Sequence, residues 1–70
     1  MREITIRGDM IRLGQLLKLA NLASGGGDIK AIIEDGVTVN GQPEGRRGRQ
    51  LHDGDEVQAV GETLRVVAQA

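Results

Sequence analysis

The stretch Gly25–Arg49, GGGDIKAIIEDGVTVNGQPEGRRGR, decides how the rest of this chain folds. Within it, the isoleucines at positions 29, 32 and 33 recur at intervals of three and four residues, which predicts one face of a short helix. Three glycines before it free the backbone for a sharp entry. Gly36 follows the last turn, where a left-handed conformation commonly ends a helix. A short helix bounded by glycines is therefore expected.

A hairpin is predicted directly after this helix. Val37–Val39 has strand character, and Asn40-Gly41 is typical of a tight turn because both residues tolerate a positive φ. The returning segment leads into a cluster of three arginines, Arg46, Arg47 and Arg49.

The segment before the glycines predicts a strand and a second helix. Glu3–Arg7 alternates polar and apolar residues, as a half-buried edge strand does. From Leu13 the apolar residues recur at helical intervals, which predicts an amphipathic helix of about three turns that ends near Leu22. Only Ala23–Gly26 separates the two helices, so they must form a helix-turn-helix corner and touch. We expect their leucines and isoleucines to supply most of the core.

The segment after the arginines predicts the remaining strands. Leu51–Asp55 is typical of a turn, Val57 and Val60 of a strand, and Gly61-Glu62 of a second hairpin turn. A last strand then carries the apolar residues Leu64, Val66 and Val67. The expected fold is a single α+β domain over residues 1–70, with two helices packed on a small, mainly antiparallel sheet.

Composition limits the class of protein. The 70 residues contain no cysteine, so disulfides and thiolate metal sites are excluded. No cofactor is expected. There is no apolar run long enough to cross a bilayer, and the charged amino terminus does not resemble a signal peptide. We expect a cytoplasmic monomer without a membrane partner.

The distribution of charge says more than its total. The net charge is −1, which argues against a protein that coats nucleic acid by bulk attraction. Six of the nine basic residues lie in the central part of the chain: Arg12, Lys18, Lys30, Arg46, Arg47 and Arg49. Because Phe, Tyr and Trp are absent, base stacking on aromatic rings is excluded. A nucleic-acid partner would be held through its phosphates and its shape.

Catalysis is poorly supported. The chain offers one serine, Ser24, one histidine, His52, and no thiol, and the two fall in different elements. A solvated turn histidine is the better interpretation. Asp53 and Asp55 lack the other oxygen ligands of a calcium loop, so no metal site is expected. An enzymatic role would require a partner chain.

Two features remain as candidate anion sites. The triple glycine could bind a phosphate at a helix start, or could serve only close packing of the helices; the two interpretations are equally supported. Arginine is suited to phosphate because its planar fork donates two hydrogen bonds at once. Nearby carboxylates could instead pair with the three arginines, and phosphate contact is only slightly favoured.

The ordered set of motifs resembles the RNA-binding domain named after ribosomal small-subunit protein S4, especially its small stand-alone bacterial members. The resemblance implies that the two helices and the hairpin form the so-called αL motif, which presents a basic surface to structured RNA. It further implies that Lys18, Lys30, Arg46, Arg47 and Arg49 contact phosphates, while Gly26, Gly27 and Asn40 shape the surface. The matching residues are Leu13–Lys18, Gly26–Lys30, Gly36–Gly41, Arg46–Arg49 and Gly54-Asp55.

The resulting hypothesis is a non-catalytic module that contacts the phosphate backbone of structured RNA, ribosomal or transfer RNA. It requires the five cations to converge on one face beside the glycine turn. The alternative is a protein-interaction module whose arginine loop docks an acidic partner. Competition between RNA and such a partner would separate the two hypotheses.

Overall fold

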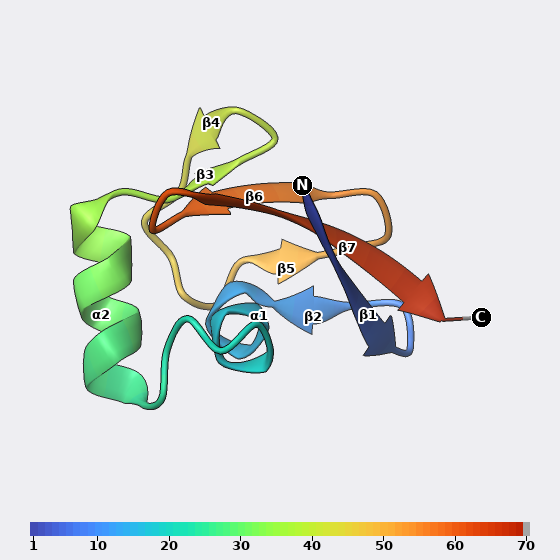
Figure 1. Ribbon diagram of the computed structural model, residues 1–70, viewed down its shortest axis with the longest axis horizontal. Helices are drawn as coiled ribbons and strands as arrows, with labels where there is room; N and C mark the ends of the chain where they lie inside the picture. The colour runs from blue at the N-terminus through green and yellow to red at the C-terminus, as the bar shows by residue number, and fades with distance from the viewer. Residues whose placement is uncertain (70) are drawn as a thin grey trace.

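The computed structural model describes residues 1–69, in which two helices and two sheets share one core (Figure 1). No helix in this range is long and apolar enough to cross a lipid bilayer. The helices are α1 (Leu13–Leu19) and α2 (Gly26–Asp35). The strands are β1 (Arg2–Arg7), β2 (Ile11–Arg12), β3 (Thr38–Val39), β4 (Gln42–Pro43), β5 (Gln50–Leu51), β6 (Glu56–Ala59) and β7 (Glu62–Gln69).

The larger sheet is mixed and has β7 near its centre. Its order is β1-β7-β6-β3-β4, and β1 runs parallel to β7 while the other neighbours are antiparallel. The predicted α+β class and the mainly antiparallel sheet are confirmed, and β1 is an edge strand as expected. The smaller sheet pairs β2 with β5 and was not predicted, because two-residue strands carry no periodic signal.

The strands supply more of the core than expected. Buried side chains from β1, β3, β5, β6 and β7 pack against three leucines of α1. From α2 only Ile29 is fully buried, whereas Ile32 and Ile33 are half-buried. The reason is the position of α2, which stands at one end of the molecule and away from most of the sheet (Figure 1). The prediction that the two helices provide most of the core was therefore wrong.

Helix α1 is shorter than predicted. It ends at Leu19, two turns after its start, because Asn21 adopts a left-handed φ of 64°. The Leu22 and Ala23 N–H groups then bend back to the Leu17 carbonyl at 2.9 and 3.2 Å. This tight reversal buries Ala23 and turns the chain towards α2.

Both hairpins turn through two residues with positive φ. Asn40 and Gly41 have φ values of 52° and 82°, as predicted. In the second hairpin Ala59 pairs with Glu62, so Val60 and Gly61 form the turn, with φ values of 53° and 72°. The prediction of a Gly61-Glu62 turn was off by one residue. Val60, expected in a strand, is instead 54% exposed in an uncommon conformation for a β-branched residue.

Candidate nucleic-acid interface

The segment Gly45–Arg49, here called the arginine loop, is attached to the start of α1. The first N–H groups of a helix have no partner within it, and Arg12 at this N-cap provides no side-chain cap. The Leu13 N–H donates to the Arg49 carbonyl and the Gly14 N–H to the Arg47 carbonyl, both at 2.9 Å. Loop carbonyls therefore accept the first hydrogen bonds of α1, and Gln15 Oε1 accepts the Arg12 N–H at 3.2 Å.

Arg47 is the central cation of the loop. Its guanidinium lies beside the start of α2, since a Cβ atom added to Gly26 would sit 3.8 Å from Nη1. Arg47, Arg12 and Lys18 line one hollow of about 230 Å³, and Arg47 and Lys30 line the next. Among the described residues none of these four cations has a carboxylate within ion-pair distance.

Arg12 was not among the predicted site residues, although the sequence held a signal for it. Arg12, Gln15 and Lys18 are spaced by three residues, which places them along one side of a helix and its N-cap. All three line the same hollow as Arg47.

Arg46 and Arg49 differ from Arg47 because both pair with Glu44. Glu44 Oε2 accepts hydrogen bonds from the Arg46 backbone N–H at 3.0 Å and from Arg46 Nε at 3.1 Å. Its Oε1 accepts from Arg49 Nη1 at 2.9 Å. The Glu44 side chain is only 7% exposed, whereas those of Arg46 and Arg49 are 76% and 37% exposed. Pairing with a nearby carboxylate, the alternative raised above, thus applies to two of the three arginines.

Glu44 is held in its charged form by these partners. The hydrogen bond from Arg46 is the main cause, and together with the bond from Arg49 it outweighs burial and lowers the pKa of Glu44 to about 2. At neutral pH the cluster therefore carries one buried negative charge behind two arginines that remain partly open to solvent.

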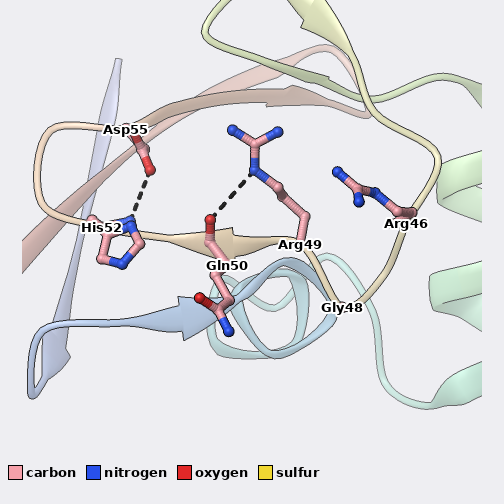
Figure 2. A pocket seen from close by; sticks show the side chains of 6 residues that line it. All are labelled: Arg46, Gly48, Arg49, Gln50, His52 and Asp55. Carbon is pink, nitrogen blue, oxygen red and sulfur yellow. Dashed lines mark hydrogen bonds between the residues drawn. The ribbon is translucent and has the colours of Figure 1, made fainter.

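The two paired arginines face a third hollow, shown in Figure 2. It measures about 680 Å³ and is also lined by Gln50, His52 and Asp55. The exposed His52 lies in a turn, as predicted, and its backbone N–H donates to Asp55 Oδ2 at 2.8 Å. Gly48 lines both this hollow and the one beside Lys18. Neighbouring hollows share residues, and the cations that line them are here called the basic face: Arg12, Lys18, Lys30, Arg46, Arg47 and Arg49. Glu34 and Asp55 line the same hollows.

The three glycines at the start of α2 are open rather than tightly packed, and the helix begins at Gly26 rather than after all three as predicted. Gly25 has an extended φ of −168°, and a Cβ atom on Gly25 or Gly27 would meet no atom within 4 Å. The close approach of the helices is instead at Gly14, where a Cβ atom would lie 3.6 Å from Ile29. Packing therefore does not account for Gly25, Gly26 and Gly27.

Asp28 places a negative charge close to this open turn. Its Oδ2 accepts hydrogen bonds from the Ser24 hydroxyl at 2.5 Å and the Ser24 N–H at 3.1 Å. These bonds lower the pKa of Asp28, so the carboxylate stays ionised. Asp28 thus stabilises the entry into α2 while opposing an anion that approaches on its side.

Asn40 is already engaged within the fold. Its Nδ2 donates to Asp55 Oδ1 at 3.0 Å, and its Oδ1 accepts the Glu56 N–H at 2.9 Å. Burial alone would raise the pKa of Asp55, but the bonds from Asn40 and from the His52 N–H lower it. Asn40 adjoins the third hollow through its bond to Asp55, which lines that hollow.

The side chains weighed above for metal binding and catalysis lie apart from one another or are engaged elsewhere. Within residues 1–69 there is no group of three His, Cys, Asp or Glu side chains that could hold a metal ion. The hydroxyl of Ser24 is bound to Asp28, a carboxylate, and no histidine is bonded to it.

The family of the chain follows from its similarity to known proteins. The family model of the S4 domain matches residues 4–67. The chain belongs to the S4 domain family. This S4 domain is also similar to the probable ribosome maturation protein RlbA of Bacillus subtilis (strain 168), with 48% identity over 59 residues that cover 83% of each chain. The resemblance found in the sequence is thereby confirmed.

Proposed function

We propose that this S4 domain is a non-catalytic RNA-binding module whose basic face contacts the phosphate backbone of structured RNA. The observation that carries the proposal is the gathering of Arg12, Lys18, Lys30 and Arg47 around the helix corner, without carboxylate partners among residues 1–69. Cations left unpaired on one face bind phosphates and release the counterions of the RNA.

The RNA we propose is ribosomal or transfer RNA, with the protein acting as a cytoplasmic monomer. The similarity to a protein named for ribosome maturation supports a ribosomal context. The absence of aromatic residues supports recognition of a folded shape, because unstacked bases are commonly read on aromatic rings. Such binding depends little on base sequence, since phosphate contacts position a protein without reading bases.

The test is the salt dependence of binding to transfer RNA and to helical fragments of ribosomal RNA. Replacing Lys18, Lys30 and Arg47 together by alanine should remove three phosphate contacts. The slope of log K against log salt concentration should then fall by about 2 to 2.7, at roughly 0.7–0.9 per contact. The loss should be similar for RNAs of different sequence.

Arg65→Ala, which removes one positive charge, is the matched control for Arg47→Ala alone. Arg65 is exposed on β7, where its register partners are Glu3 and Glu56, and it lies outside the basic face. Its removal should leave the slope unchanged. Wild-type binding that does not respond to salt, or an equal loss in the control, would refute the proposal. Crosslinking in cells and sequencing of the captured RNA would identify the ligand.

A further inference from the structure

Glu44 is the one buried charged residue in the described part of the chain, and it lies behind the basic face. Each of its carboxylate oxygens binds a different arginine, Oε2 binding Arg46 and Oε1 binding Arg49. The Arg46 backbone N–H also donates to Oε2, so the same carboxylate holds the loop backbone at Arg46. One carboxylate thus links two side chains that are three positions apart.

The geometry leaves donors of both arginines free. A guanidinium has five N–H groups, and Arg46 uses only that of Nε for Glu44. The edge formed by its two terminal nitrogens, which suits a phosphate, is unoccupied by protein partners in residues 1–69. Arg49 binds Glu44 through Nη1 and the Gln50 carbonyl through Nε at 3.4 Å, which leaves Nη2 free. Figure 2 shows both side chains extending from the loop into the same hollow.

We propose that Glu44 is a positioning residue for RNA recognition: it orients Arg46 and Arg49 so that together they grip a backbone phosphate in the hollow beside His52. This inference rests on the proposed RNA-binding function. The rival view is that Glu44 merely cancels positive charge and so weakens RNA binding.

The two views predict opposite changes in RNA affinity when the Glu44 carboxylate is removed. An arginine side chain loses rotamer freedom when it binds a phosphate, and prior ordering by Glu44 removes part of that cost from the binding step. If ordering dominates, removal of the carboxylate weakens binding although it raises the net charge by one. If charge dominates, the same removal strengthens binding, because one negative charge near the phosphate is gone.

Glu44→Gln is the decisive variant because it is nearly isosteric and uncharged. The amide keeps one acceptor oxygen, but its NH₂ group cannot accept from the second arginine. We expect transfer RNA to bind about 2–5-fold more weakly, because one of the two arginines loses its acceptor and the gained charge offsets part of that loss. The salt slope should fall by about 0.7–0.9 if one phosphate contact is lost. Unchanged or tighter binding would overturn the inference.

A second pair of changes separates position from charge and does not disturb the buried carboxylate. Arg46→Lys with Arg49→Lys keeps every charge and leaves Glu44 paired, but a lysine lacks the planar fork. Positioning predicts weaker binding of transfer RNA, whereas charge alone predicts no change. If Glu44→Gln does not fold, unchanged binding of this double variant would still overturn the inference, because an oriented guanidinium fork would then be unnecessary.

Two further measurements complete the design. In wild type without RNA, the Arg46 Nε–H should give a sharp, slowly exchanging ¹⁵N NMR signal. Glu44→Ala leaves no acceptor and should remove this signal; a signal equally sharp in both proteins would refute the ordering. In a background with Arg46→Ala and Arg49→Ala, Glu44→Gln should not weaken binding.

If Lys18, Lys30 and Arg47 also prove irrelevant to RNA affinity, the proposed function itself fails. If they matter and Glu44→Gln binds as wild type, only the positioning role fails.

Discussion

At the residue scale, neighbouring arginines have different environments. Arg47 is next to Arg46 in sequence, yet its carbonyl accepts a hydrogen bond from α1 and its guanidinium lies by Gly26. Arg46 and Arg49 instead share Glu44. Which of the three arginines pairs with a carboxylate could not be predicted from the sequence. They lie within four positions, and their environments depend on the path of the loop. The sequence also did not indicate that their partner is Glu44 rather than Asp53 or Asp55.

The low pKa of Glu44 makes a prediction about acid stability. Its ordinary pKa of 4.5 falls to about 2 in the folded protein, chiefly through the hydrogen bond from Arg46. A lowered folded-state pKa means that this pairing contributes its full stability above about pH 5 and loses it as the pH falls towards 2. Wild type should therefore exceed Glu44→Gln in free energy of unfolding at neutral pH, and the difference should shrink in acid. Urea unfolding at a series of pH values measures this, and a difference that stays constant would contradict it.

At the scale of elements, the bounds of α2 were predicted better than those of α1. The isoleucine spacing and Gly36 located α2, because both signals are local. The end of α1 depends on the left-handed Asn21, and its start depends on carbonyls about 35 residues away, as the bond from Leu13 to Arg49 shows. Neither has a local signature. The convergence of Lys18, Lys30 and Arg47 was expected only from the family resemblance.

The glycines at the two ends of α2 should respond oppositely to alanine. Gly36 has a φ of 125°, so Gly36→Ala should cost about 1–2 kcal/mol of stability through backbone strain alone, as no atom lies within 4 Å of the new Cβ. Gly27 is helical and equally open, so Gly27→Ala should stabilise the protein by up to about 1 kcal/mol.

Thermal or urea unfolding of both variants checks this pair. Gly45→Ala is the neutral control, because Gly45 has neither a positive φ nor a neighbour within 4 Å of an added Cβ. If Gly27→Ala destabilised the protein as much as Gly36→Ala, the described helix start would be wrong.

At the scale of the whole molecule, the first strand of the chain pairs with the last strand in the larger sheet. β7 pairs with β1 on one side and β6 on the other, so residues from both ends of the chain form one layer. The alternation of Glu3–Arg7 predicted the strand, but its parallel pairing needs knowledge of β7, more than 50 residues later. The buried Ile4 and Ile6 attach this strand to the core.

A single change in β1 should affect the stability of the entire domain. Ile6→Ala should cost about 2–4 kcal/mol, which is a large fraction of the roughly 4–10 kcal/mol expected for a chain of this length. Loss of the cooperative transition in urea, or a much lower midpoint, is the expected result. Thr5→Ala, on the exposed face of the same strand, should change the midpoint little. Equal effects would show that β1 does not contribute to the core as described.

The hydrogen bonds from α1 to the carbonyls of Arg47 and Arg49 also restrict how such a protein can evolve. An extra residue in the arginine loop would pull these acceptors out of register, and the helix would lose the groups that begin it. New RNA preferences can therefore arise here by exchanging side chains at a fixed loop length, whereas insertions should be rejected by selection on folding before their effect on binding matters.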